Sequence, residues 1–375
     1  MKIIAIIPSL NEADSIAFVT KTIDKGLRKI SGNPKALIVN SDGGSTDKTS
    51  DVFLKTNTFF PKKVISYNGK KVGKGRNVFE VLKLYKNSAD YFLMIDGDIT
   101  SIKTDWASKL LSPLLNKEAD LSVPIYKRNR YEGNTTNHFS SPLIYAFFGE
   151  NIAQPIAGDF AFSKKMAKKI YESFSSDSDY GYGVDTLITW TALLNRFKIK
   201  QIRLGKKIHK PSFPKIVSMF GQVCFSTINL LGENRESVKK GLSSKKKQLS
   251  NMLEAIDDTY IKVPTTKKIV EVENIAYMLM KKQRISEVIS GSKTTSCLNM
   301  DIWTDILCKH IDIVLKKRLK KKEKDELVES ITAYYLLRVL GYFKEIEKLS
   351  AKEIDQLLIA QKQMLQEKVG KILSN

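Results

Sequence analysis

The chain of 375 residues is long enough for two domains, or for one large domain with an elaboration. Hydrophobic residues make up 42% of it and charged residues 27%, which places it among ordinary soluble globular proteins. The apolar stretch at Met1–Ile7 is too short for a signal peptide, and no window approaches the roughly 20 apolar residues of a membrane-spanning helix. Its three cysteines form no paired motif, so we expect a cytoplasmic protein with free thiols.

The formal net charge of +22 favours anionic partners. Nucleic acid is not expected, because lysines are scattered along the whole chain and no zinc-finger or RNP1-like pattern is present. A phosphorylated small molecule is favoured, and a membrane surface stays open as a less favoured partner. A Lys-rich and Ile-rich composition also fits genome bias or a hot habitat, without any functional meaning.

The first two hundred residues alternate strands and helices, which predicts an α/β fold with a mostly parallel sheet covered by helices on both faces. Strands are expected at Lys2–Ile7, Ala36–Asn40, Val64–Ser66, Tyr91–Ile95, Leu121–Ile125, Ile156–Phe162 and Ile199–Leu204. Helices are expected at Ala13–Ile30, Gly75–Tyr85, Trp106–Leu115 and Val184–Leu194. From about Ile216 onward, amphipathic helices dominate, as at Leu327–Tyr342 and Ile354–Val369.

The strand Tyr91–Ile95 runs directly into Asp96-Gly97-Asp98. Residues i and i+2 of an extended chain face the same side, so both carboxylates can lean over one point. The glycine between them leaves room for a ligand near the backbone. Such a pair suits a divalent cation that also binds substrate phosphates, whereas the alternative is an ordinary turn after a strand. Because ligands of such sheets bind at the carboxyl ends of the strands, we predict a metal or nucleotide site here.

The loops Pro8–Glu12 and Ser41–Asp47 each follow a strand directly, as Asp96–Asp98 does, so we expect the three loops to converge on one crevice. Lys74 lies between two glycines before a helix and can approach a diphosphate, although the segment is not a P-loop. Ser41 and Asp42 end the second strand and can bind a base or ribose, while Ser45 or Thr46 reads as the next helix cap. A lone histidine is more often a surface or packing residue, but His209 could supply a third metal ligand.

Asp159 and Asp185 each follow glycine-containing sequence, where a substrate can approach closely; Asp185 could equally be a first-turn acid of its helix. The polar, basic segment Tyr126–His138 is typical of a mobile substrate loop. Its side chains suited to an acidic acceptor are Lys127, Arg128, Arg130, Asn134, Thr135 and Thr136.

Together these residues resemble the GT-A glycosyltransferases, and within them the retaining glucosyl-3-phosphoglycerate synthases and mannosylglycerate synthases. The resemblance covers roughly residues 1–232 and implies a GT-A domain there, with a helical C-terminal region at 233–375. It implies that the loop after the first strand and Asp96-Gly97 hold the nucleotide. It also implies that Asp98 and His209 bind the metal, with Asp96 nearby. The implied nucleotide contacts are Pro8, Leu10, Asn11, Glu12, Ser41, Asp42, Lys74, Asp96 and Gly97.

The implied activity is metal-dependent, retaining transfer of glucose or mannose from UDP-glucose or GDP-mannose to glycerate or 3-phosphoglycerate, with Mg²⁺ or Mn²⁺. Lys74 would then assist the leaving diphosphate, and Asp159 and Asp185 would act at the sugar. A homodimer is expected. The alternative is transfer to a polyprenyl phosphate or a surface glycan. A nucleotidyltransferase is disfavoured, because no Gly-rich-Arg-Lys signature follows the first strand, and a catalytically silent binding protein stays open.

Overall fold

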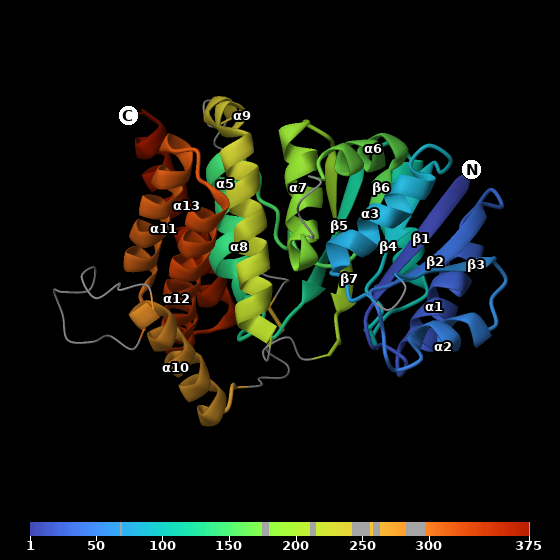
Figure 1. The fold of residues 1–375 in the computed structure, drawn as a ribbon, viewed down its shortest axis with the longest axis horizontal. Helices are drawn as coiled ribbons and strands as arrows, with labels where there is room; N and C mark the ends of the chain where they lie inside the picture. The colour runs from blue at the N-terminus through green and yellow to red at the C-terminus, as the bar shows by residue number, and fades with distance from the viewer. Residues whose placement is uncertain are drawn as a thin grey trace. The chain divides into compact units, whose positions relative to one another are not determined.

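The computed structural model describes residues 1–67, 70–174, 180–210, 215–241, 256–257, 263–282 and 297–374. The chain forms two compact units (Figure 1). We call Met1–Tyr126 with Ile156–Pro214 the sheet unit, and Lys127–Pro155 with Lys215–Asn375 the helical unit. This division differs from the expected boundary after residue 232, since residues 127–155 and 215–232 lie in the helical unit.

The described part of the sheet unit contains one seven-stranded sheet in the order β3-β2-β1-β4-β6-β5-β7. Parallel pairs join β1 to β2 and β4, and β2 to β3, whereas β6 runs antiparallel to β4 and β5. The predicted, mostly parallel sheet is therefore confirmed. The strands are β1 (Lys2–Ser9), β2 (Lys35–Asp42), β3 (Lys62–Ile65), β4 (Tyr91–Met94), β5 (Leu121–Lys127), β6 (Phe160–Ser163) and β7 (Ile199–Lys206).

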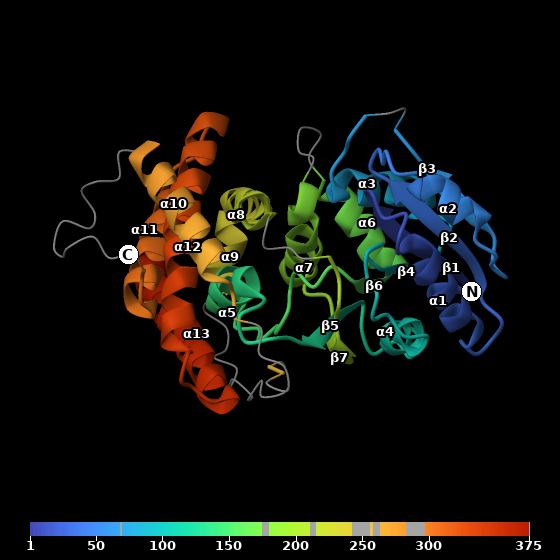
Figure 2. The ribbon, with the colours of Figure 1, turned by 90° about the horizontal axis from the view of Figure 1, so that it is seen from below.

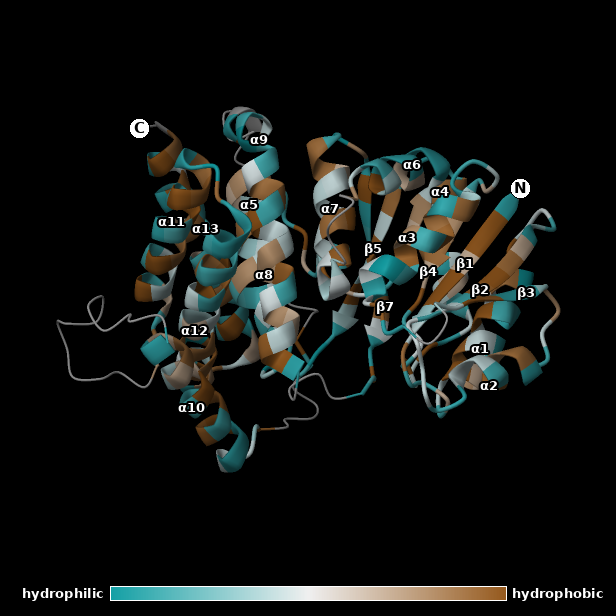
Figure 3. Ribbon diagram, in the orientation of Figure 1, coloured by the Kyte–Doolittle hydropathy of each residue, from teal (hydrophilic) through white to brown (hydrophobic). Residues whose placement is uncertain are grey.

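Central strands are buried on both faces because their sequences are continuously apolar. In β1, every residue from Ile3 to Ser9 is buried, and Figure 3 shows hydrophobic stretches along β1 and β2. Helices α1 and α4 cover one face, and α3 and α6 cover the other (Figure 2). The helices of this unit are α1 (Ile16–Arg28), α2 (Thr49–Lys55), α3 (Lys74–Tyr85), α4 (Asp105–Leu115), α6 (Lys164–Glu172) and α7 (Val184–Leu194).

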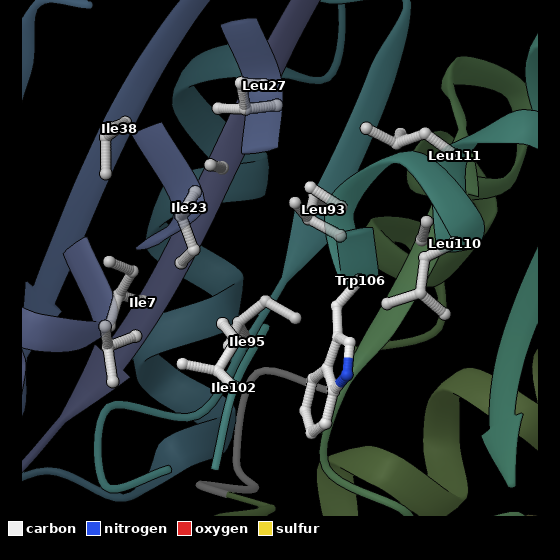
Figure 4. Close-up of a cluster of buried hydrophobic side chains, with 14 of the residues drawn as sticks. Ile7, Ile23, Leu27, Ile38, Leu93, Ile95, Ile102, Trp106, Leu110 and Leu111 are labelled. Atoms are coloured by element: carbon white, nitrogen blue, oxygen red, sulfur yellow. The ribbon is translucent and has the colours of Figure 1, made fainter. Parts of the chain in front are cut away.

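One apolar cluster joins the sheet to α1 and α4 (Figure 4). Trp106 of α4 is fully buried, and its ring packs against Tyr126 of β5 with centroids 5.2 Å apart. Each large apolar side chain buried in this way stabilises the fold by roughly 1.5–3 kcal/mol. The cluster holds the strands rigidly, and with them the loops that follow the strands. Its labelled members are Ile7, Ile23, Leu27, Ile38, Leu93, Ile95, Ile102, Trp106, Leu110 and Leu111.

The helical unit is built from helices that pack lengthwise. Helix α5 packs on α13, and α12 packs on α8, α10 and α11. The expected helices at Leu327–Tyr342 and Ile354–Val369 are confirmed as parts of α12 and α13. The elements are a π-helical turn (Thr136–Ser140), α5 (Ser141–Phe148), α8 (Ile216–Glu233), α9 (Arg235–Gly241), α10 (Thr266–Lys282), α11 (Met300–Lys316), α12 (Lys321–Glu345) and α13 (Ala351–Ser374).

Among the residues that the structure describes, none of the helices combines the length and the apolar character needed to span a membrane.

Candidate active site

The sheet topology brings several sequence-predicted residues to one edge. The parallel strands β1, β2 and β4 end at the same edge, so the loops after Ser9, Asp42 and Met94 are neighbours. Strand β6 is antiparallel to β4, and Phe160 pairs with Met94. The segment just before β6, with Asp159, therefore lies beside the Asp96 turn.

A largely buried cluster of charges lies at this edge, centred on Asp96, whose own side chain is 23% exposed. Its Oδ1 is 2.7 Å from the Nζ of Lys74, and its Oδ2 is 3.1 Å from the Nζ of Lys207. Lys74 also reaches Asp185 at 3.1 Å, and Lys207 reaches Asp159 at 2.8 Å. Three carboxylates thus share two ammonium groups, and the cluster carries one negative charge in excess when all five groups are ionised.

Each member of the cluster has a shifted pKa, because burial penalises charge and the neighbours compensate for it unequally. Burial alone would raise the pKa of Asp96, but Lys74 and Lys207 lower it to about 2. Burial raises the pKa of Asp159 and of Asp185, against the opposing effect of the nearest lysine. The electrostatics therefore keep Asp96 firmly ionised and leave the other two carboxylates less compensated.

Asp159 is fully buried and held by three donors. Its Oδ1 accepts a hydrogen bond from the backbone N–H of Asp96 at 2.8 Å. Its Oδ2 accepts from the hydroxyl of Tyr126 at 2.5 Å and from Lys207 at 2.8 Å. Asp185, the second residue of α7, retains 7% exposure. Of the two acids predicted to act at the sugar, Asp185 is the one with some access to solvent.

The predicted nucleotide loops interlock through their own hydrogen bonds. Asn11, at φ +59°, donates its backbone N–H to the Oγ of Ser45 at 2.8 Å and accepts from the N–H of Thr46 at the same distance. Asp42 accepts from the backbone N–H groups of Gly44 and Ser45 within its own turn. Helix α2 begins only at Thr49, so the expected cap at Ser45 or Thr46 is wrong, and Ser45 instead ties this turn to Asn11.

The remaining predicted nucleotide contacts lie at the same strand ends. Pro8 and Ser41 are register partners in β1 and β2, and the hydroxyl of Ser41 is 3.1 Å from that of Tyr67. Leu10 is 41% exposed, an apolar side chain open to solvent at the edge where a base would pack. The Cα of Gly97 faces the carbonyl of Pro8, so the Asp96 turn and the end of β1 approach closely.

Glu12 and Asp98 form a second acidic pair beside the buried cluster. Burial raises the pKa of Glu12 to about 7; the ion pair with Lys210 opposes the shift, and the charge of Asp98 adds to it. The Nζ of Lys210 lies 2.7 Å from the Oε2 of Glu12 and 3.1 Å from the Oδ1 of Asp14. Two carboxylates that repel each other in this way fit a divalent cation, which would relieve the repulsion.

His209 lies on a segment that is hydrogen-bonded to the Asp98 turn. The carbonyl of Ile208 accepts from the N–H of Thr100 at 2.9 Å, and the N–H of Ile208 donates to the Oγ of Ser101 at 2.7 Å. The imidazole is exposed, with Nδ1 2.7 Å from the carbonyl oxygen of Lys210. Within the described ranges, no group of three or more His, Cys, Asp or Glu side chains is arranged to hold a metal ion.

The predicted acceptor residues lie in the helical unit, and most are engaged there. Arg130 is buried and donates to the carbonyls of Ile346 and Leu349, at 3.3 and 2.6 Å, near the end of α12. Asn134 is also buried, and Thr135 and Thr136 contact neighbouring side chains of the same unit. Arg128 is half-buried, while Lys127, the last residue of β5, is exposed.

Sequence reasoning missed Lys207, Tyr126 and Lys210. Lys207 stands beside Lys206 and close to Lys210, and the sequence does not show which of these lysines has a buried side chain. The mobile loop expected at Tyr126–His138 is wrong at both ends, because Tyr126 is a buried residue of β5 and His138 is buried in a π-helical turn. Only the antiparallel placement of β6 brings Asp159 to the hydroxyl of Tyr126. Their positions in the sequence could have identified them. Tyr126 lies at the end of β5, and Lys207 and Lys210 follow β7, at the edge where the predicted site lies.

Comparison with known proteins shows a family to which part of this chain is similar. Residues 4–173 match the family model described as Glycosyl transferase family 2. Among curated proteins, no sequence matches this chain.

The structure is similar to solved structures of glucosyl-3-phosphoglycerate synthase from Mycobacterium tuberculosis. Its complex with Mn²⁺, UDP-glucose and phosphoglyceric acid is 26% identical, with a TM-score of 0.50 over 62% of this chain and 80% of that chain. Its complex with Mn²⁺ and UDP-glucose is also 26% identical, with a TM-score of 0.50 over 62% and 79%. The complex with phosphoglyceric acid alone is 24% identical, with a TM-score of 0.51 over 62% and 80%, and supports the shared fold.

Proposed function

We propose that this glycosyltransferase with a GT-A fold is a metal-dependent retaining hexosyltransferase. The match of residues 4–173 to the model of Glycosyl transferase family 2 supports the proposal. The proposed donor is UDP-glucose or GDP-mannose, and the proposed acceptor is glycerate or 3-phosphoglycerate. The similar structures from Mycobacterium tuberculosis contain UDP-glucose and phosphoglyceric acid, and so support UDP-glucose as the donor and 3-phosphoglycerate as the acceptor among these candidates.

The observation that carries the proposal is the pairing of a buried charge cluster with a half-exposed acidic pair at one edge of the sheet. The departing nucleoside diphosphate develops negative charge on its β-phosphate, so catalysis requires positive charge there. Asp98 and His209 would hold Mg²⁺ or Mn²⁺, with Glu12 beside them, and the bound cation would stabilise that charge. Asp96 is engaged by two lysines, and we assign it to the shell around the metal.

The acids of the buried cluster take different roles in this proposal. Asp185, which keeps some exposure, would accept hydrogen bonds from sugar hydroxyls. Asp159 has three protein donors and no exposed surface, so it would support the site without touching the sugar. Lys74 donates toward Asp96, Asp185 and the carbonyl of Gly158, and contact with a phosphate would require it to release one of these acceptors.

The nucleotide would lie across the ends of β1 and β2. The exposed side chain of Leu10 offers an apolar surface for the base, and the polar groups of Asn11 and Ser41 offer hydrogen bonds to base and ribose. The acidic acceptor would be bound by Lys127 and Arg128, the two predicted basic residues that are not buried. A carboxylate or phosphate is the group that such side chains bind most strongly.

The test is to incubate the protein with UDP-glucose or GDP-mannose, each with glycerate or 3-phosphoglycerate, with and without Mg²⁺ or Mn²⁺. Products and their anomeric configuration are read by NMR. An α-linked product that forms only with metal supports the proposal. A β-linked product from the α-donor would overturn retention. Absence of transfer to either acceptor, with donor binding intact, would overturn the acceptor class and leave the glycosyltransferase assignment standing.

A further inference from the structure

Lys207 connects three separate segments of the sheet unit. Its Nζ lies 2.8 Å from the Oδ2 of Asp159, 3.1 Å from the Oδ2 of Asp96 and 2.8 Å from the carbonyl oxygen of Ala157. The ammonium also lies 5.3 Å from the ring centroid of Tyr126. Its side chain is only 9% exposed. One buried cation therefore joins the end of β7 to the Asp96 turn and to the segment that precedes β6.

These contacts use all the donors that an ammonium group has. Lysine carries three N–H donors and no acceptor, and the three oxygen acceptors around Lys207 are all protein atoms. A phosphate could bind Lys207 only by displacing a buried carboxylate or a carbonyl. Lys74 also has three protein acceptors, but its partner Asp185 keeps 7% exposure, whereas Asp159, the partner of Lys207, has none. This difference favours a supporting role for Lys207 over a contact with the substrate.

The backbone around Lys207 is fitted to this arrangement. Gly158 has φ +90°, and a Cβ at this position would collide with the carboxylate of Asp96 and lie 2.9 Å from the Nζ of Lys207. Asp159 is fully buried, and Lys207 is its only ion-pair partner within the described residues. Removing one partner of a buried ion pair leaves an uncompensated charge, which is far more costly than losing a surface pair.

We propose that Lys207 is a positioning residue of the transferase site: it fixes the Asp96 carboxylate and the Ala157–Asp159 segment where the donor needs them, without contacting the donor. This inference rests on the proposed function for its catalytic consequence. The ion-pair arrangement itself can be tested without substrate.

The experiment compares the wild-type protein with Lys207→Met, Lys207→Arg and the control Lys200→Met. Lys200 lies on β7, the strand that precedes Lys207, is exposed, and has its Nζ 4.0 Å from the Oε2 of Glu118 at the surface. We expect Lys207→Met to lower kcat with UDP-glucose by about 100-fold, a change of the size that loss of one preorganised interaction produces. The donor KM should change much less, Lys207→Arg should recover most of kcat, and Lys200→Met should match the wild type.

Binding of UDP and of uridine, each measured in EDTA, distinguishes positioning from phosphate contact, because the metal shell to which Asp96 is assigned then takes no part. If Lys207 only positions its neighbours, Lys207→Met changes the affinities for both by a similar factor. A loss confined to UDP would assign Lys207 to the diphosphate and overturn the inference. Wild-type kcat in Lys207→Met, or no recovery in Lys207→Arg, would overturn it as well.

A double-mutant cycle between Lys207→Met and Asp159→Asn, measured by denaturant unfolding, tests the arrangement independently of any substrate. Because Asp159→Asn removes the charge that Lys207 compensates, we expect Lys207→Met to cost much less stability in that background. Additive effects would overturn the inference. If the wild-type protein turns over no nucleotide sugar, the proposed function fails, and this cycle with the UDP and uridine affinities decides the role of Lys207.

Discussion

The backbone N–H of Asp96 donates a 2.8 Å hydrogen bond to the carboxylate of Asp159, so the turn after β4 and the entry to β6 hold each other in place. The two residues lie 63 positions apart in the chain. Their contact exists because β6 pairs antiparallel with β4 and brings its first residues to the strand end where Asp96 lies. The position of the Asp96 carboxylate is therefore set by the sheet and by Asp159 together.

The first prediction concerns Tyr126→Phe, which removes the hydroxyl that donates to Asp159 and keeps the ring against Trp106. A hydrogen bond to a buried charged group contributes about 1.5–3 kcal/mol, so we expect a fall of this order in the free energy of unfolding. Denaturant unfolding measures it. An unchanged midpoint would show that Asp159 does not depend on this donor.

The second prediction concerns the metal. Asp98→Ala should abolish the Mg²⁺ or Mn²⁺ dependence of UDP-glucose binding and weaken that binding by about tenfold or more, since a carboxylate ligand is lost. Isothermal titration with and without EDTA measures both effects. Asp14→Ala is the control, because Asp14 is 68% exposed and contacts only Lys210 among the described ion pairs. Equal metal dependence in Asp98→Ala and the wild type would place the cation elsewhere.

The third prediction separates the two kinds of basic residue in the predicted acceptor segment. Arg130→Ala should lower the free energy of unfolding by about 3 kcal/mol, because it removes buried donors from the carbonyls that end α12. Lys127→Ala should leave stability unchanged, since the side chain is exposed, and should raise the acceptor KM. Thermal unfolding and acceptor kinetics on both variants check this contrast. An acceptor KM unaffected by Lys127→Ala would remove Lys127 from the proposed acceptor contacts.

The fourth prediction uses two helical glycines that differ in their surroundings. A Cβ on Gly341 of α12 would collide with the backbone of Leu298, whereas one on Gly370 of α13 would meet nothing within 4 Å. Gly341→Ala should destabilise the protein by about 1–3 kcal/mol despite the better helix propensity of alanine. Gly370→Ala should stabilise it by about 0.5–1 kcal/mol through that propensity alone. Chemical denaturation measures the free energy of unfolding of both variants. Equal changes in the two variants would contradict the close packing of Gly341 against Leu298.

The fifth prediction follows from Lys362, a buried residue of α13 whose Nζ donates to the Oδ1 of Asn151 at 2.9 Å. Burial lowers the pKa of Lys362 to about 8, with Asp355 opposing the shift, from an ordinary value of 10.5. Below pH 8 Lys362 is protonated in the folded and in the unfolded protein, so its buried charge lowers the stability of the folded protein by the full amount. Between pH 8 and 10.5 the unfolded chain binds more protons, so this residue makes stability rise with pH, by about 3 kcal/mol in total.

Lys362→Met should remove that penalty. The variant should therefore gain stability over the wild type at pH 7, and the difference should shrink as the pH rises toward 10. Urea unfolding at several pH values measures the difference, and Lys371→Met, an exposed lysine of the same helix, serves as the control. A difference that is constant with pH would show that Lys362 titrates normally in the folded protein.

Much of the sheet unit could be predicted because its signals are local. The apolar run before Asp96 identifies β4, and the loops after β1 and β2 follow from strand ends that any α/β reading places at one edge. The neighbouring glycines and the resemblance assign Lys74 and Asp159 to the site, and both lie at this edge in the structure. A strand and its end are recognised from neighbouring residues alone, so their prediction requires no knowledge of distant contacts.

The parts that could not be predicted depend on residues far apart in the chain. Nothing near Arg130 shows that its guanidinium will be buried against the end of α12, more than two hundred positions later. Likewise, no local pattern distinguishes the buried Lys207 from the exposed Lys206 beside it. A long basic side chain can be solvated at the surface, bind a substrate or pair with a buried carboxylate. Only the tertiary structure shows which of these applies to a given residue.

The interleaving of the two units has a consequence for biosynthesis. Residues 127–155 leave the sheet unit between β5 and β6, and their helix α5 packs on α13 at the other end of the chain. During translation α5 is made long before residues 351–374, so the part of its surface that α13 covers stays exposed until then. Removal of α13 would leave that part of the surface uncovered even in the folded chain, because α9 and the π-helical turn cover only the rest.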